Sequence, residues 1–419
     1  MMPPSDPLAN VPPPGKRRLA LRVTPAALRA VRQGHPWVFD KAIAGQREDG
    51  QAGDLAVIFD DRRRFAAIGL YDPTSPLRVR VLHQGAATAI DRAWLRDRLA
   101  AAASWRAGLS ESGTTGYRLV HGENDGLPGL VIDRYDATLV LKLYTAAWIP
   151  WLSELRAALE AACPSSCVVL RLSRDLMGRP DRLFGLADGA VLAGPVPAGP
   201  VLFRENGLRF GADVLRGQKT GFFLDQRDNR ERVERLAAAL DGDTSVLNVF
   251  SYTGGFSLYA ARGGAHAVFS LDAAAPALAA AERNFALNAD VPAVAAARHT
   301  TIEGDAFAAL AGMGREGRRF DLVIADPPAF TRRADEAGVA LQAYGRLTGL
   351  ALGVLAPGGI LVIASCSAQV SAQSFFEAVN GAADRAGRPL SEFDRTGHAI
   401  DHPVRFPEGA YLKCLYATA

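Results

Sequence analysis

Several side chains that could bind a ligand or react with one stand where predicted strands end. They are Asn248, Asp272, Asp305, Asp326 and Cys366, and each lies at the end of a short apolar run or directly after one. From residue 245 onward such runs alternate with helical patterns, which predicts a parallel, doubly wound α/β sheet. Ligands of these sheets bind outside the carboxyl ends of the strands. The five side chains are therefore predicted to line one site.

Cys366 and Asp326 suit covalent chemistry on a nucleic acid base. A thiolate adds to carbon 6 of a pyrimidine ring and makes carbon 5 nucleophilic toward a methyl sulfonium. Asp326 precedes Pro327 and Pro328, whose stiff backbone would hold the carboxylate against the hydrogen-bonding edge of a flipped base. A free thiol has a pKa of about 8.5, so this chemistry requires a site that stabilises the thiolate. A buried structural cysteine is the alternative.

A tight glycine turn follows the apolar run at residues 246–250, and a helical pattern follows the turn. Asp272 ends the next strand-like run, 18 positions after Gly254, where nucleotide-binding folds hold a ribose hydroxyl. The turn reads T-G-G-F and lacks the third glycine that a dinucleotide's pyrophosphate requires. It favours S-adenosylmethionine over a dinucleotide, while a glycine turn without a cofactor stays open.

The predicted cofactor-binding residues follow from this turn and from the strand ends. Asp272 would accept hydrogen bonds from the ribose, and Asp305 from the adenine amine. Asp305 has a second interpretation, as the N-cap of a helix that begins at Ala306. The full predicted set is Asn248, Phe250, Tyr252, Thr253, Gly254, Asp272, Asp305 and Asp326.

Composition predicts a globular chain in a reducing compartment. The chain has 419 residues, of which 49% are apolar, and a formal net charge of only +3, so bulk charge does not indicate a nucleic acid partner. Its four cysteines are too few and too scattered for a disulfide framework, which predicts a cytoplasmic protein. Cys163 and Cys167 have no neighbouring histidine, so no metal site is predicted, and no segment has the pattern of a membrane span.

Four segments are predicted along the chain. Residues 1–16 are proline-rich and are expected to form a disordered leader. Residues 17–84 contain short alternating runs separated by turns and, with G-H-P-W-V-F at 34–39, resemble a PUA-type RNA-binding domain. Residues 85–200 are predicted to form a small central α/β domain. Residues 201–419 are predicted to form a Rossmann-like domain.

Five motifs follow one another along the chain: Q-K-T-G-F-F-L-D-Q-R-D-N-R (218–230), N-V-F-S-Y-T-G-G-F-S (248–257), D-P-P-A-F (326–330), S-C-S (365–367) and D-H-P-V with F-P-E-G-A-Y-L-K (401–413). In this order they resemble the large-subunit ribosomal RNA 5-methylcytosine methyltransferases of the PUA-containing type. The resemblance implies a class I methyltransferase fold, S-adenosylmethionine as donor and ribosomal RNA as partner. It implies that Cys366 is the catalytic cysteine, assisted by Asp326, and Pro327, Pro328 and Phe330 are predicted to contact the substrate base.

Ala329 departs from the pattern of the family, which usually has lysine there, while many other RNA 5-methylcytosine enzymes have a second cysteine that helps to release product. The group that removes the carbon-5 proton is therefore left open. The modified nucleotide, the choice between naked RNA and an assembling subunit, and the oligomeric state, a homodimer included, are open as well.

Three other functions compete with this interpretation. An exocyclic-amine methyltransferase acting on adenine or guanine would stack the base on an aromatic residue after D-P-P, but Ala329 stands there and Phe330 comes one place late. A non-catalytic RNA-binding or ribosome-assembly factor would keep the fold without the transfer. A nicotinamide oxidoreductase is the last alternative, and titration with both cofactors would distinguish it.

Overall fold

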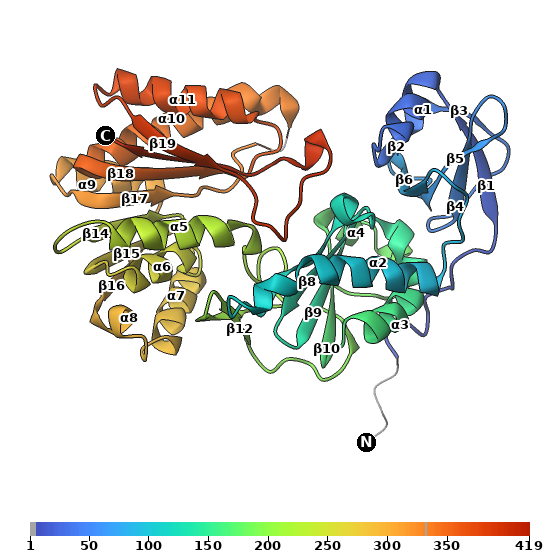
Figure 1. Ribbon diagram of the computed structural model, residues 1–419, viewed down its shortest axis with the longest axis horizontal. Coiled ribbons are helices and arrows are strands. Elements are labelled where there is room, and N and C mark those ends of the chain that lie inside the picture. The colour runs from blue at the N-terminus through green and yellow to red at the C-terminus, as the bar shows by residue number, and fades with distance from the viewer. Residues whose placement is uncertain (1–5, 332) are drawn as a thin grey trace. The chain divides into compact units, whose positions relative to one another are not determined.

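The computed structural model describes residues 6–331 and 333–419 and divides the chain into two compact units (Figure 1). The first unit comprises Met1–Gly207, Ala212–Leu224 and Ile400–Phe406. The second comprises Leu208–Gly211, Asp225–Ala399 and Pro407–Ala419. In the part of the chain that is described, no helix is both long enough and apolar enough to cross a membrane.

A six-stranded sheet with the strand order β2-β6-β5-β4-β1-β3 forms one part of the first unit. Strands β1 and β4 are parallel, and the other neighbours are antiparallel. Helix α1 (Pro25–Arg32) begins after Thr24, whose hydroxyl caps its first turn, and buries Leu28 and Val31. The strands are β1 (Arg18–Val23), β2 (Trp37–Phe39), β3 (Ile43–Gln46), β4 (Leu55–Phe59), β5 (Phe65–Tyr71) and β6 (Leu77–Gln84).

A five-stranded sheet with the order β11-β10-β9-β8-β7 forms the rest of that unit's core. Trp148, Leu155 and Leu170 are fully buried there. Its helices are α2 (Arg92–Trp105), capped by Asp91, α3 (Leu152–Ala162) and α4 (Arg174–Met177). Its strands are β7 (Gly116–His121), β8 (Leu130–Tyr135), β9 (Thr138–Leu143), β10 (Cys167–Leu172) and β11 (Val191–Ala193), and β12 (Val201–Glu205) follows them in sequence.

The segment preceding the six-stranded sheet makes contacts with the core of the first unit. Leu8 is only 4% exposed and belongs to the same apolar cluster as Trp148, with Val11 packed against that cluster. Arg156 donates to both carboxylate oxygens of Asp6 at 2.9 Å. Two apolar side chains within the proline-rich segment, Leu8 and Val11, therefore pack against this cluster, and a disordered leader over residues 1–16 stays a prediction. Residues 1–5 of that prediction lie outside the described residues.

A seven-stranded sheet, ordered β16-β15-β14-β17-β18-β20-β19, organises the second unit. The first five strands in this order, β16, β15, β14, β17 and β18, are parallel to one another. Strand β20 runs antiparallel to both of its neighbours, β18 and β19. The strands of this sheet are β14 (Ser245–Val249), β15 (Ala267–Asp272), β16 (Arg298–Glu303), β17 (Phe320–Ala325), β18 (Leu355–Ser365), β19 (Ser391–Thr396) and β20 (Lys413–Thr418). Strand β13 (Leu208–Ala212) is not part of it.

Two groups of helices cover this sheet (Figure 1). The first group is α5 (Arg227–Ala238), α6 (Gly255–Arg262), α7 (Ala275–Leu287) and α8 (Pro292–Ala296); the second is α9 (Ala306–Arg315), α10 (Ala337–Val354) and α11 (Ala372–Arg385). Strands buried on both faces are expected to be apolar throughout, and β17 and β18 read F-D-L-V-I-A and G-I-L-V-I-A-S accordingly. The predicted doubly wound, Rossmann-like fold is confirmed.

Strand β14 stands where the chain changes direction across the sheet. From β14 the chain continues to β15 and β16 on one side, and then returns to β17 and β18 on the other. Helices on opposite faces diverge at such a switch point and leave a crevice above the carboxyl ends of the strands. This is the edge at which the sequence places its chemical residues.

The boundaries of the two units differ from the predicted segments. Residues 201–207, 212–224 and 400–406 belong to the first unit, although they fall within the predicted Rossmann-like segment. The two sheets of the first unit correspond to predicted residues 17–84 and 85–200, but both lie in one compact unit. Their division into separate domains stays a prediction.

Candidate active site

The predicted strand-end residues gather along one edge of the seven-stranded sheet. Asp272 is the last residue of β15, Asp326 directly follows β17, and Cys366 directly follows β18. Because β15, β14, β17 and β18 are consecutive parallel neighbours, their carboxyl ends lie at the same edge. The glycine turn after β14 lies between Asp272 and the other two. The structure therefore brings Asp272, Asp326 and Cys366 to one side of the fold.

The turn after β14 has an unusual backbone. Phe250, Tyr252 and Gly254 have φ angles of 61°, 47° and 74°, in the left-handed region that bulky residues rarely adopt. A Cβ atom at Gly254 would come within 2.8 Å of the Cβ of Ala281, so the close packing also requires glycine there. Strained residues of this kind persist at ligand sites when their surroundings hold them in place. The sequence identified the turn but gave no sign of the strain at Phe250 and Tyr252.

Asp272 holds this turn. Its Oδ2 accepts a hydrogen bond from the Tyr252 amide at 2.8 Å, and its Oδ1 accepts one from the Ala274 amide at 2.9 Å. Each carboxylate oxygen has a second lone pair available for a ligand. Asp272 therefore fixes the turn, and its contact with a ribose stays a prediction.

Asn248 lies beneath the turn and is fully buried. Its Nδ2 donates to the Ser257 hydroxyl at 2.9 Å, and hydrogen bonds continue through Ser270 to Nε2 of His299. Burial lowers the pKa of His299 to about 4, so this ring is neutral at neutral pH. The chain of bonds ties β14, α6, β15 and β16 together. Direct contact of Asn248 with the cofactor stays a prediction.

Three buried polar atoms at the turn fit a polar ligand. Oδ1 of Asn248, Oγ of Ser251 and Oγ1 of Thr253 have no hydrogen-bond partner among the described residues. Leaving such a group unsatisfied costs about 1–3 kcal/mol, and a ligand with its own donors and acceptors would remove that cost. The residues present therefore suit the amino acid and ribose groups of S-adenosylmethionine.

Asp305 is the N-cap of helix α9, as the second interpretation of this residue predicted. The residue is exposed, and its Oδ1 accepts a hydrogen bond from the Ala308 amide at 2.9 Å as the N-cap of α9. The cap uses only Oδ1, so a contact between the other carboxylate oxygen and adenine stays a prediction.

The D-P-P-A-F segment begins at the sheet edge and ends against the core. Asp326 is half-buried, Pro327 is buried and Pro328 is exposed. The ring of Phe330 packs edge-on against Tyr344 with the centroids 4.8 Å apart. Phe330 thus packs against an aromatic side chain of α10, and contacts of Pro327, Pro328 and Phe330 with a base stay predictions.

Cys366 is half-buried between two residues whose positions are fixed. The Ser365 hydroxyl donates to the Tyr344 hydroxyl at 2.8 Å and accepts from the Ser367 amide at 3.3 Å. Burial, together with the nearby Cys366 and Asp326, raises the pKa of Tyr344 to about 12, while the hydrogen bond with Ser365 opposes this change. Cys366 and Asp326 are therefore within electrostatic range of one phenol, although they follow different strands. Sequence analysis did not identify Tyr344, because it lies mid-helix within an ordinary apolar pattern.

Among the described residues, no group of three or more His, Cys, Asp or Glu side chains is arranged to hold a metal ion.

Comparison with known proteins decides the family. A family profile described as S-adenosylmethionine-dependent methyltransferase matches residues 118–404, and a PUA-like domain matches residues 21–84. A "Ribosomal RNA large subunit methyltransferase" of Deinococcus radiodurans is 51% identical over 95% of this chain and 97% of its own length. This chain belongs to that methyltransferase family. The predictions of the cofactor and of a PUA-like domain are confirmed, and S-adenosylmethionine is the methyl donor of the family.

Other relatives of the methyltransferase agree in architecture. A "Ribosomal RNA large subunit methyltransferase I" of Shewanella amazonensis is 36% identical over 95% of this chain and 99% of that relative. The solved structure of a SAM-dependent methyltransferase from Streptococcus mutans aligns with a TM-score of 0.79 over 96% of this chain and 100% of that chain, at 22% identity. Another solved methyltransferase, complexed with SAH, also aligns with a TM-score of 0.79, at 21% identity. At these identities the two structures show a shared fold.

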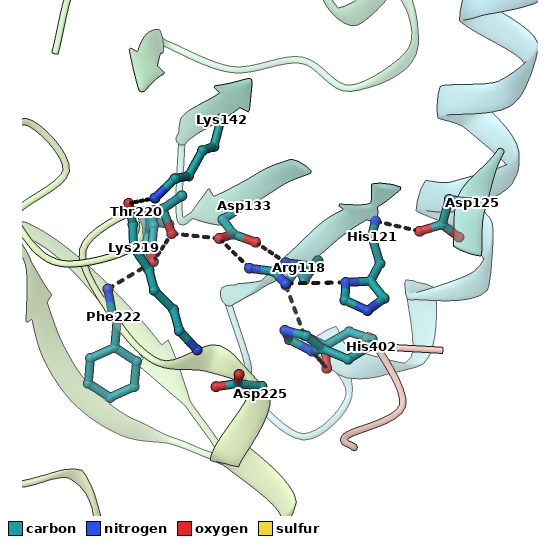
Figure 2. A network of polar contacts seen from close by, with 12 residues as sticks. Arg118, His121, Asp125, Asp133, Lys142, Lys219, Thr220, Phe222, Asp225 and His402 are labelled. Carbon is teal, nitrogen blue, oxygen red and sulfur yellow. Dashed lines mark hydrogen bonds and ion pairs between the residues drawn. The ribbon is translucent and has the colours of Figure 1, made fainter. Parts of the chain in front are cut away.

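A polar network in the first unit of the methyltransferase fixes the beginning of the motif at residues 218–230 (Figure 2). The Thr220 hydroxyl donates to Asp133 Oδ2 at 2.5 Å, and the Phe222 amide donates to the Tyr135 hydroxyl at 3.1 Å. Lys142 Nζ donates to the Lys219 carbonyl at 3.0 Å. The first residues of this motif are therefore anchored on β8 and β9, an arrangement that the sequence did not predict.

We expect Asp272→Ala to weaken binding of S-adenosylmethionine by roughly 1.5–3 kcal/mol, the range for hydrogen bonds to a charged group. The variant loses the acceptor for the ribose and also the acceptor that holds the Tyr252 amide. Isothermal titration calorimetry measures the change, with Asp243→Ala as control, because Asp243 is an exposed carboxylate in the loop before β14. Wild-type affinity in Asp272→Ala would show that the cofactor does not use this carboxylate.

Proposed function

We propose that this methyltransferase forms 5-methylcytosine in large-subunit ribosomal RNA through a covalent adduct of Cys366. The observation that carries the proposal is the position of Cys366, directly after β18 and at the same sheet edge as Asp326 and the glycine turn. A nucleophile for the base and a site for the methyl donor are then adjacent. The names of the relatives, which are large-subunit ribosomal RNA methyltransferases, support the choice of RNA.

The proposed reaction uses the thiolate as a temporary substituent of the ring. The sulfur of Cys366 adds to carbon 6 of cytosine, and the electron pair of the 5,6 double bond moves to carbon 5. Carbon 5 takes the methyl group, and the carbon–sulfur bond of the sulfonium breaks with its electron pair left on sulfur. A base then removes the carbon-5 proton, the 5,6 double bond forms again, and the thiolate leaves.

Other residues of the chain have supporting roles in this proposal. In its protonated form, Asp326 would donate a hydrogen bond to N3 of cytosine and stabilise the negative charge that develops on the ring when the thiolate adds. Pro327, Pro328 and Phe330 would shape the position of the base. The PUA-like sheet would contribute affinity for RNA through phosphate contacts without taking part in the chemistry. The base that removes the proton is left unassigned, because Ala329 has no titratable group.

The adduct gives a direct test. RNA carrying 5-fluorocytosine should trap the wild-type protein as a species that survives a denaturing gel, because fluorine cannot leave from carbon 5 as a proton does. The same mixture with Cys366→Ala should show no such species. An exocyclic-amine enzyme needs no thiol adduct, so absence of trapping by wild-type protein that still methylates the same RNA would overturn the proposal and favour that alternative.

A further inference from the structure

Lys413 is the first residue of β20 and is buried, with only 4% of its surface exposed. In the antiparallel pairing of β20 with β18 it stands opposite Ser365, the residue before Cys366. None of the ion pairs in the described part of the chain includes Lys413. Burying an ammonium without a carboxylate partner lowers the stability of the fold unless hydrogen bonds offset the loss of hydration.

The three N–H groups of this ammonium all have carbonyl acceptors. Two belong to the segment that follows Cys366: the carbonyls of Ser367 and Val370, at 2.5 and 2.6 Å from Nζ. The third is the carbonyl of Tyr411, at 3.2 Å. An ammonium has three donors, so its hydrogen-bonding capacity is filled. Lys413 therefore holds the segment that carries Cys366 in place against β20.

The charge of Lys413 also acts on Cys366. Burial lowers the pKa of Lys413 to about 8, while the nearby Cys366 opposes that change. At pH 7 the side chain is still mostly protonated. The Tyr344 phenol on α10 is within electrostatic range of both Cys366 and the Asp326 carboxylate after β17. The phenol is neutral at this pH and the carboxylate would disfavour a thiolate, so Lys413 is the group among these that favours one.

We propose that Lys413 is a positioning residue for Cys366, fixing the loop after β18 through the carbonyls of Ser367 and Val370 and stabilising the Cys366 thiolate with its charge. The role of Lys413 in catalysis rests on the proposed function, because only a thiol that attacks cytosine needs to ionise near neutral pH. Its physical content, the coupling between one ammonium and one thiol, is independent of RNA.

The test measures how fast iodoacetamide alkylates Cys366 as a function of pH, in the full-length protein without RNA. Mass spectrometry of the peptide that contains Cys366 separates its signal from those of Cys163, Cys167 and Cys414. We expect Lys413→Met to move the midpoint of the pH profile upward by about one unit, which is roughly a tenfold slower reaction at pH 7. Lys413→Arg should keep the midpoint near that of the wild type, since it keeps the charge.

Lys413→Gln separates charge from loop fixation. Its amide retains two N–H donors for the carbonyls, so the fold should be preserved even if Lys413→Met does not fold, and the midpoint should still rise. The control is Lys142→Met, which removes another ammonium that donates to a carbonyl, in the first unit; it should leave the midpoint unchanged. A wild-type midpoint in folded Lys413→Gln would overturn the proposal.

Failure of this inference and failure of the proposed function give different results. If 5-fluorocytosine traps the wild-type protein while Lys413→Gln has a wild-type profile, Cys366 is the nucleophile and Lys413 does not tune it. If the midpoint shifts but no adduct forms, the Lys413 coupling holds and the cytosine mechanism is wrong.

Discussion

Cys366→Ala is expected to lower methyl transfer to RNA by roughly three orders of magnitude or more, as removal of a catalytic nucleophile does. The same variant should bind S-adenosylmethionine with wild-type affinity, because the residues predicted for the cofactor lie on the turn after β14 and the ends of neighbouring strands, whereas Cys366 follows β18. Single-turnover incorporation of a labelled methyl group measures transfer, and calorimetry measures binding.

The matched control is Cys167→Ala. Cys167 is the first residue of β10 in the first unit, so Cys167→Ala should leave both methyl transfer and S-adenosylmethionine binding unchanged. It should lower the stability of the protein only slightly. If Cys366→Ala retained substantial transfer, the thiol adduct would be excluded. The D-P-P turn, in the exocyclic-amine alternative, would then be the element that holds the base.

The positions of the chemical residues could be predicted because parallel strands impose them. Asp272, Asp326 and Cys366 each follow an apolar run, and the rule that parallel strands end at one edge brings them together. That inference needs no knowledge of side-chain contacts. It therefore gave the edge correctly, although the seven-stranded order was not specified in advance.

What the sequence could not give depends on pairing and on backbone detail. Lys413 lies near Cys366 only because β20 inserts antiparallel beside β18, and no local pattern encodes that register. The left-handed conformations of Phe250 and Tyr252 oppose the intrinsic preference of those residue types. The burial of Leu8 could not be predicted either, because composition averages over a segment, whereas burial acts on single side chains.

A second large effect is expected at Asp133, whose carboxylate is fully buried in the polar network of the first unit (Figure 2). Its Oδ1 accepts from Arg118 Nε at 2.8 Å, and its Oδ2 accepts from the same guanidinium at 3.1 Å and from Thr220. The Arg118 side chain is only 11% exposed. Removal of the carboxylate would leave this guanidinium buried without its bidentate partner.

We expect Asp133→Ala to lower the free energy of unfolding of the first unit by roughly 3–5 kcal/mol, the cost of breaking a buried ion pair by removing one partner. All five tryptophans, Trp37, Trp94, Trp105, Trp148 and Trp151, lie in this unit, so tryptophan fluorescence during urea denaturation reports on it selectively.

Two further variants decide whether the buried charge is the cause. Asp97→Ala removes a carboxylate from an ion pair with Arg96 in which both side chains are more than half exposed, and should cost at most about 1 kcal/mol. Adding Arg118→Met to Asp133→Ala should recover part of the lost stability, because the uncompensated charge is then removed as well. The free energy of unfolding of the double variant could instead fall further below that of Asp133→Ala, by the full cost of a second core substitution. In that case lost packing, and not the buried charge, would explain the effect.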